Sequence, residues 1–156
     1  MSARVRSHID EFLAKHRIAM IGVSRRTSHF SRKLFTEFRR NYYDVVPVNP
    51  AAADIDGLRC YPRVQDIDPP VEGALVIVPA AELLRTLVDC EAAGISSVWI
   101  YGVNGPRDVA DEAVAFCALR GIAAVPGYCP FMFFPRITFV HRAHRAVLKL
   151  MGAFPV

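Results

Sequence analysis

No stretch of this chain is apolar for long enough to cross a membrane, because Arg, His, Asp or Glu interrupts every apolar segment. A membrane span would need about 18 such residues. The first residues also lack the apolar core of a secretory signal, since Arg4, Arg6 and His8 lie close together there. A hydrophobic content of 53% excludes a disordered chain. These observations predict one globular domain over residues 1–156, located in the cytoplasm.

Cysteine pairs at metal-binding or redox-motif spacing are also lacking. The four cysteines form no C-x-x-C motif, and none has a histidine at zinc spacing; they are Cys60, Cys90, Cys117 and Cys129. We therefore expect no metal site and reduced thiols. Cys90 and Cys117 lie within apolar helical patterns and are predicted to be small core residues, whereas Cys129 follows a predicted strand.

Acidic side chains are absent after Glu112, while basic ones continue at Arg120, Arg136, Arg142, Arg145 and Lys149. The net charge of +4 therefore reflects a basic C-terminal end. We expect residues 137–156 to form a basic helical extension, because Ile137–Met151 has an amphipathic pattern. Such a helix packs on its own domain, across a homodimer, or on a partner or membrane surface. Basic residues rarely alternate with aromatic ones, so nucleic-acid binding is not expected.

Short apolar strands alternate with helical patterns along the rest of the chain. The N-terminal helix has Val5, Ile9, Phe12 and Leu13 on one face, and a second helix is predicted to begin near Ser31 as its N-cap. This alternation predicts an α/β fold, a Rossmann-like doubly wound five-stranded parallel sheet in the order 3-2-1-4-5 with helices on both faces. The predicted strands are Arg17–Val23, Asp44–Val48, Gly73–Val78, Ser97–Tyr101 and Ile122–Val125, and the later helices are Ala80–Ala93 and Asp108–Leu119.

The loop after the first strand has few glycines for a dinucleotide-binding loop. Gly22 stands alone, and Ser24 occupies the place of the second glycine of G-x-G-x-x-G. The second strand ends at Asn49-Pro50, with no carboxylate to bind a ribose hydroxyl. Both departures count against NAD. The loop is instead rich in hydroxyl and guanidinium groups, which suits a ligand with more phosphate charge.

Further motifs follow in order, namely Val48-Asn49-Pro50, Ile55-x-Gly57, Tyr61, Val78-Pro79, Trp99 and Cys129. Together with Ile21-Gly22-Val23-Ser24-Arg25, they resemble the small CoA-binding domain proteins, which are similar to the CoA-binding domain of the succinyl-CoA synthetase alpha subunit. The resemblance covers about Arg17 to Pro130. It implies a Rossmann-like domain that binds a small nucleotide ligand, coenzyme A or an acyl-CoA, usually without a demonstrated reaction.

The resemblance also implies roles for particular residues. Gly22, Val23, Ser24 and Arg25 would surround the pyrophosphate, with Ser31 and Arg32 at the helix entrance; Asn49 and Pro50 would border the adenosine end; Pro79, Tyr101 and Gly102 would shape the rest of the crevice. The family commonly has glutamine where this chain has Tyr101. Trp99 is expected in the core. The segment Tyr128–Phe134 is more aromatic than the usual family ending, and it either joins the core or covers a pantetheine or acyl arm.

Other functions stay open from the sequence. The chain could be an NADP-binding oxidoreductase or redox sensor, with Arg25 or Arg26 on the ribose phosphate. Cys129 could exchange with the CoA thiol, or be an inert, partly buried residue. The basic C-terminal helix could make the chain an interaction module. His29 is expected to contact phosphate or solvent rather than act as a general base.

Overall fold

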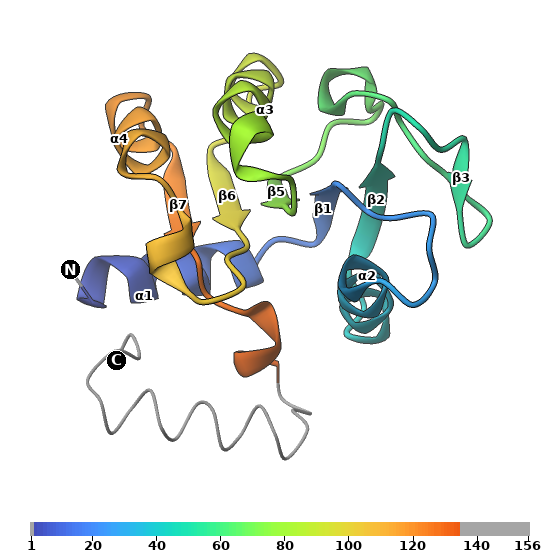
Figure 1. Cartoon of the computed structure of the whole chain (residues 1–156), viewed down its shortest axis with the longest axis horizontal. Coiled ribbons are helices and arrows are strands. Elements are labelled where there is room, and N and C mark those ends of the chain that lie inside the picture. The colour runs from blue at the N-terminus through green and yellow to red at the C-terminus, as the bar shows by residue number, and fades with distance from the viewer. Residues whose placement is uncertain (1, 135–156) are drawn as a thin grey trace.

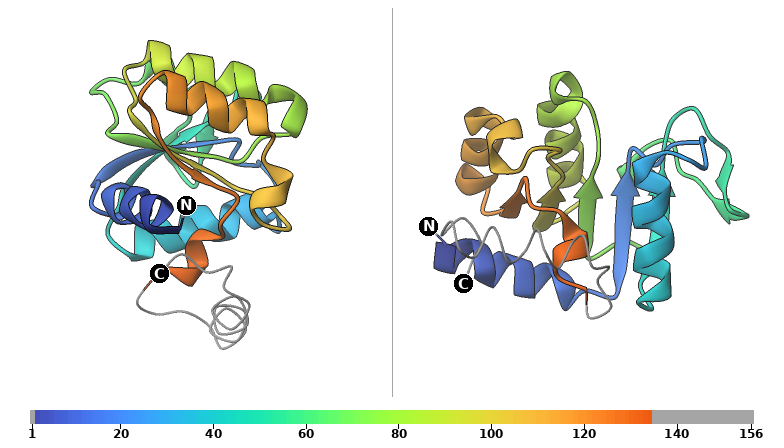
Figure 2. Two further views of the ribbon diagram at one scale, coloured as in Figure 1. Left: turned by 90° about the vertical axis from the view of Figure 1, so that its left-hand side faces the viewer. Right: turned by 60° about the horizontal axis from the view of Figure 1, so that its bottom comes forward.

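The computed structural model describes residues 2–134 (Figure 1). Within this range five parallel strands form one sheet in the order β2-β1-β5-β6-β7. Helices α1 and α2 cover one face of the sheet, and α3 and α4 cover the other (Figures 1 and 2). The predicted doubly wound α/β fold is therefore confirmed. The elements are α1 Ser2–Leu13, β1 Arg17–Ile21, α2 Phe30–Arg40, β2 Asp44–Val48, β5 Gly73–Val76, α3 Ala80–Ala92, β6 Ser97–Ile100, α4 Asp111–Leu119 and β7 Ala123–Pro126.

The position of β5 corrects the predicted strand order. The third long strand pairs with β1, where Ile18 lies opposite Gly73, instead of extending the sheet beyond the first two strands. The order is thus 2-1-3-4-5 in the numbering of the prediction, and 3-2-1-4-5 was wrong. Pro47 of β2 gives a physical reason. Its carbonyl faces the outer edge and accepts from the Tyr61 N–H at 3.0 Å, but its nitrogen carries no hydrogen for a further strand.

Shorter elements lie in the connections between and after the long ones. A hairpin of β3 Asp54–Ile55 and β4 Leu58–Arg59 follows β2, and Asp56 at its tip has a positive φ of 52°. The sequence had not predicted this hairpin. Three-residue 3₁₀ helices occupy Val64–Asp66, Pro106–Asp108 and Pro130–Met132.

The core lies on both faces of the sheet, as continuous apolar strands require. Trp99 on β6 is fully buried, which confirms its predicted place, and its Nε1 donates to the Tyr128 carbonyl at 2.7 Å. Cys90 and Cys117 are buried core residues as predicted. Burial raises the pKa of the first thiol to about 12 and of the second to about 11.

The aromatic segment after β7 reaches this core only in part. Phe134 is buried and lies edge-on to Phe38, with ring centroids 4.8 Å apart, and Met132 is also buried. Phe131 and Phe133 are half-buried. The predicted basic extension over residues 137–156 lies outside the described residues. No helix in the described range has the length and apolar character of a membrane span.

Candidate functional site

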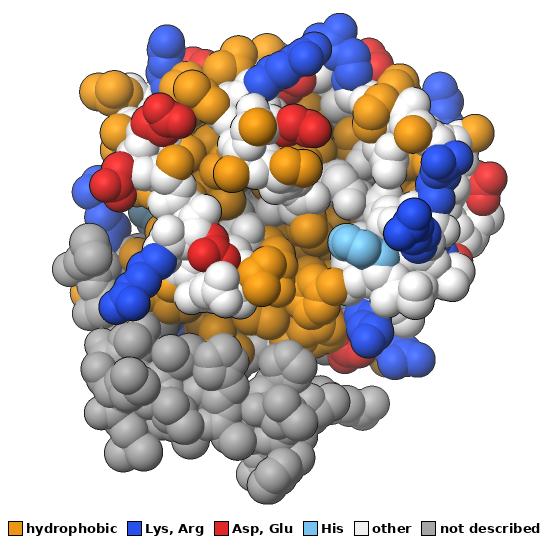
Figure 3. All heavy atoms as spheres, viewed as in Figure 1, with side chains coloured by type: hydrophobic (Ala, Val, Ile, Leu, Met, Phe, Trp, Pro, Cys, Tyr) orange, Lys and Arg blue, Asp and Glu red, His pale blue; other side chains and the backbone are white. Residues whose placement is uncertain are grey.

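The neighbouring strands β1 and β5 send their connections to opposite faces of the sheet. β1 continues into α2 on one face, and β5 continues into α3 on the other. In sheets of this kind, ligands bind at the carboxyl ends of such diverging strands. Figure 3 shows apolar side chains gathered in a hollow near the middle of the molecule. A histidine and several basic side chains line the side of the hollow on which β1 runs into α2.

Gly22 brings the exits of β1 and β5 together. Its φ is +92°, and its N–H donates to the Val48 carbonyl of β2 at 2.9 Å. A Cβ at this position would lie 2.0 Å from the Ile77 carbonyl oxygen. Only glycine therefore fits, both for its backbone conformation and for this close approach.

A serine inside α2 holds the loop that follows Gly22. The Ser31 hydroxyl accepts from the Ser24 N–H at 2.9 Å, and the Ser24 hydroxyl accepts from the Arg26 N–H at 3.1 Å. The prediction that Ser31 caps the helix was wrong, because His29 is the N-cap and its Nδ1 accepts from the Ser31 N–H at 3.2 Å. The Ser31 hydroxyl, fully buried, is used by the loop instead.

Arg32 supports the same loop from the protein side. Its Nη1 donates to the carbonyls of Ser24 and Arg25, each at 3.3 Å, and its Nη2 is ion-paired with Asp56 at the tip of the β3–β4 hairpin. Arg32 is only 7% exposed, and its Nε is buried with no hydrogen-bond partner in the described part of the chain. Arg32 thus supports the backbone of the predicted phosphate loop more than it faces a ligand.

Asn49 links the end of β2 to this loop. Its Nδ2 donates to the Val23 carbonyl at 2.7 Å, and its Oδ1 accepts from the Ala51 N–H at 2.8 Å. Val23 is 0% exposed, backbone included, so it lies behind the loop surface. Pro50, next to Asn49, is exposed.

The outer side of the loop offers hydrogen-bond donors. The Arg25 side chain is exposed. Within residues 2–134, the backbone N–H groups of Arg25, Thr27 and Ser28 have no hydrogen-bond partner. Together with the positive end of α2, they form a surface suited to an anion.

The carboxyl end of β6 contributes the opposite wall. Tyr101 stacks on Phe30, the first residue of α2, with ring centroids 4.7 Å apart. Burial raises the pKa of the Tyr101 hydroxyl. Gly102 is buried, and a Cβ there would lie 2.5 Å from the Gly105 carbonyl oxygen. Pro79 is exposed and immediately precedes α3.

Cys129 lies after β7 and is half-buried. Burial raises the pKa of its thiol to about 11. At neutral pH the thiolate that attacks disulfides is therefore a very small fraction. No group of three or more His, Cys, Asp or Glu residues that could hold a metal ion occurs in the described range.

Residues 16–135 match the family described as CoA binding domain. The chain belongs to this family. It is 28% identical over 109 residues to the alpha subunit of acetate–CoA ligase [ADP-forming] II of Pyrococcus furiosus, covering 67% of this chain and 24% of that protein. It is 32% identical over 85 residues to acetate–CoA ligase [ADP-forming] II of Archaeoglobus fulgidus, covering 53% of this chain and 13% of that protein. This CoA-binding domain thus spans a quarter or less of the length of these relatives.

Solved structures with the same fold include a hypothetical protein from Pyrococcus horikoshii OT3. It has a TM-score of 0.71 at 21% identity, and the match covers 95% of this chain and 92% of that one. The apo dinucleotide-forming acetyl-coenzyme A synthetase 1 of Ca. Korarchaeum cryptofilum has a TM-score of 0.62 at 24% identity, covering 73% of this chain and 26% of that one. The fold of this CoA-binding domain therefore occurs both in chains of similar length and within a longer chain.

Sequence reasoning missed Phe30 and Asp56 as parts of the site. Asp56-Gly57 has the composition of a turn, which was the available local signal. Its pairing with Arg32, 24 residues earlier, follows no local pattern. Phe30 lies between the predicted loop and the predicted helix, where no sequence pattern marks it. Its stacking on Tyr101 shows that it belongs to the candidate site.

Proposed function

We propose that this chain binds coenzyme A or an acyl-CoA non-covalently, without catalysing a reaction on it, and that the β1–α2 loop holds the pyrophosphate. The observation that carries the proposal is the braced loop after Gly22. Ser31 and Arg32 hold its backbone from the protein side, while the exposed residues Arg25, Thr27 and Ser28 keep backbone N–H groups without a partner among the described residues. Membership of the CoA-binding domain family supports the choice of ligand.

The surroundings of the loop suit the two ends of such a ligand. No carboxylate directly follows β2, where Asn49 and Pro50 stand, so a phosphate on the ribose meets no repulsion from this turn. In the opposite direction, Pro79, Tyr101 and Gly102 follow β5 and β6. We place the adenosine end of the ligand near Asn49 and its pantetheine arm toward Tyr101.

Two ionisable groups near this crevice, Cys129 and Asp108, favour binding over catalysis. Burial keeps the Cys129 thiol protonated. The Asp108 carboxylate accepts from the Asn104 N–H at 2.6 Å, and hydrogen bonds from Asn104 lower its pKa. A carboxylate held ionised in this way is a poor general acid, and a thiol held neutral is a poor nucleophile.

Isothermal titration with CoA, dephospho-CoA and NADP, in the presence of a reductant, tests the proposal. We expect CoA to bind and NADP not to bind. Arg25→Ala should weaken CoA binding by about tenfold or more, because a charge-assisted hydrogen bond to phosphate is lost. Arg85→Ala removes the same charge from an exposed position on α3, on the other face, and should leave the affinity unchanged.

Failure of CoA and dephospho-CoA to bind would overturn the proposal. Binding of NADP in place of CoA would favour the oxidoreductase or redox-sensor alternative. Equal losses in Arg25→Ala and Arg85→Ala would show that the loop is not where the phosphates lie.

A further inference from the structure

An aromatic surface begins where the phosphate loop ends. Phe30 directly follows His29, the N-cap of α2, and stacks on Tyr101 with an angle of 27° between the rings. Phe131 lies edge-on to Phe30, with centroids 5.8 Å apart. All three residues are half-buried, so part of each remains at the surface.

The same surface is continuous with open space beside the loop. An open groove of about 370 Å³ has Phe131 as its one aromatic lining residue, and the rest of its lining is polar or charged: Thr27, Arg32, Lys33, Thr36, Glu37, Arg40 and Asp56. Because Phe131 also contacts Phe30, the aromatic surface lies at the edge of this groove. Figure 3 shows apolar side chains filling the hollow beside the basic rim.

A donor-rich loop beside an aromatic surface is complementary to a ligand that has an anionic part and an apolar part. Free CoA ends in a small thiol, which would cover little of the aromatic surface. An alkyl acyl group on that sulfur would bury its methylenes against the rings, and each buried methylene strengthens binding roughly fourfold. The difference between the two ligands therefore lies in this contact.

We propose, on the basis of the CoA-binding function above, that the preferred ligand is an acyl-CoA with an apolar acyl group of several carbons, and that Phe30 and Tyr101 determine this preference. The neighbouring thiol is compatible with a bound thioester, because Cys129 is held protonated and so does not attack it. The acyl group is held and not transferred.

Titration of the native protein with free CoA, acetyl-CoA, butyryl-CoA and hexanoyl-CoA tests this proposal without any substitution. We expect affinity to rise along the series, with butyryl-CoA binding about fifteenfold more tightly than acetyl-CoA because it has two more methylenes. Free CoA should bind least tightly. A flat series, or free CoA binding as tightly as butyryl-CoA, overturns the proposal while leaving the CoA-binding function intact. Absence of binding by every member would overturn the CoA-binding function itself.

Substitutions then assign the preference to the rings. Tyr101→Ala and Phe30→Ala should flatten the series, because butyryl-CoA and hexanoyl-CoA lose more affinity than free CoA, whose phosphates still contact the loop. Tyr101→Phe keeps the stacked ring and should keep the preference. Tyr42→Ala serves as a surface control, because Tyr42 is 88% exposed. Thermal unfolding of each variant identifies any that fails to fold. A full acyl preference in folded Tyr101→Ala and Phe30→Ala would overturn the assignment to these rings.

Discussion

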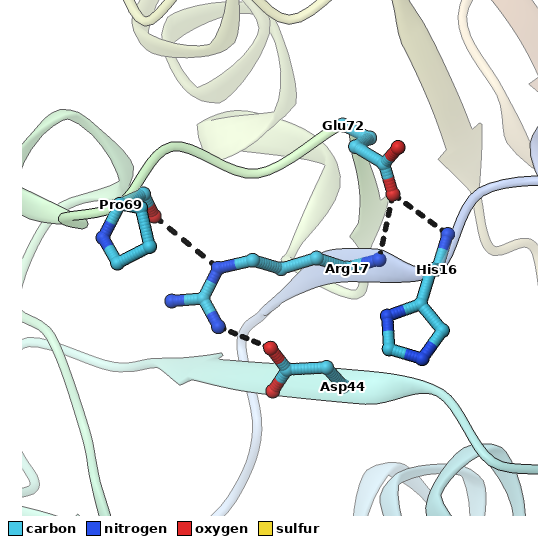
Figure 4. A network of polar contacts seen from close by, with 5 residues as sticks. All are labelled: His16, Arg17, Asp44, Pro69 and Glu72. Carbon is cyan, nitrogen blue, oxygen red and sulfur yellow. Dashed lines mark hydrogen bonds and ion pairs between the residues drawn. The ribbon is translucent and has the colours of Figure 1, made fainter.

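The two ends of the same sheet use charged side chains in opposite ways. At the amino ends of the strands, shown in Figure 4, Arg17 of β1 is ion-paired with Asp44 of β2, and its Nε donates to the Pro69 carbonyl at 3.2 Å. Glu72, just before β5, accepts from the N–H groups of His16 at 2.7 Å and Arg17 at 2.8 Å. Charged groups here join one strand to the next.

At the carboxyl ends, a buried arginine supports a loop instead of joining two strands. Arg32 contacts Asp56 and the carbonyls of Ser24 and Arg25, and this arrangement leaves Arg25 exposed. The comparison teaches that the partner of an arginine distinguishes its role. Arg17 joins β1 to β2 and to the segment before β5, whereas Arg32 holds the loop from which Arg25 extends.

The largest effect is expected from Gly22→Ala, which places a side chain where the carboxyl ends of β1 and β5 come together. The new Cβ would lie 2.0 Å from the Ile77 oxygen in a residue with φ of +92°. We expect a loss of about 3 kcal/mol or more in unfolding free energy, measured by urea titration, together with loss of CoA binding.

Gly57→Ala is the matched control for this variant. Gly57 also has a positive φ, of +76°, but nothing lies within 4 Å of its would-be Cβ. Gly57→Ala should lower the unfolding free energy by about 1 kcal/mol, from backbone strain alone. Equal losses at the two glycines would contradict the importance of the close approach between β1 and β5.

The next largest effect on stability and CoA binding is expected from Arg32→Ala. Arg17→Ala, at the other end of the sheet, is the variant with which it is compared. Arg32→Ala should lower the unfolding free energy by about 1–3 kcal/mol and weaken CoA binding at least tenfold, because the loop loses its support. Arg17→Ala should cost about 1 kcal/mol or less, as a partly exposed ion pair does, and leave CoA affinity unchanged. Urea unfolding and calorimetry measure both.

Arg32→Lys separates charge from geometry. Lysine keeps the positive charge but lacks the planar fork that reaches Asp56 and the loop carbonyls together, so it should recover only part of the affinity. If Arg17→Ala weakened CoA binding as much as Arg32→Ala, the two ends of the sheet would not differ as described.

The smallest effect is expected from Glu72→Gln at the amino end. Hydrogen bonds from the N–H groups of Arg17 and His16 lower the pKa of the Glu72 carboxyl. The folded state therefore binds this proton less readily than the unfolded state, so the carboxylate stabilises the fold above its unfolded pKa of about 4.3. This contribution is lost as the pH falls through the lower, folded value.

Urea unfolding between pH 7 and pH 3 measures this dependence. Glu72→Gln should be less stable than the native protein at pH 7, and the difference should shrink as the pH falls below about 4. CoA affinity at pH 7 should not change, because Glu72 lies at the other end of the sheet from the loop. A difference that grew on acidification would contradict the direction of this pKa shift.

Local patterns predicted the residues of the candidate loop and located all of the long strands. Gly22 followed by Ser24 and Arg25 marked the loop, and Asn49-Pro50 marked the end of the second strand. What the patterns did not reveal was which groups hold each other. Ser31 has the composition of a helix cap, yet its hydroxyl contacts Ser24 because His29 already caps the helix.

The sequence by itself determined the strand-helix alternation, because hydrophobic periodicity and turn residues act over a few neighbouring positions. Its ordered motifs also indicated the family and led to the prediction of a phosphate loop. Only the tertiary structure decided that β5 lies beside β1, that Asp56 reaches Arg32, and that Tyr101 stacks on Phe30. These contacts join residues far apart in the chain. Their pairing depends on how the whole sheet is ordered and covered, and no local pattern encodes it.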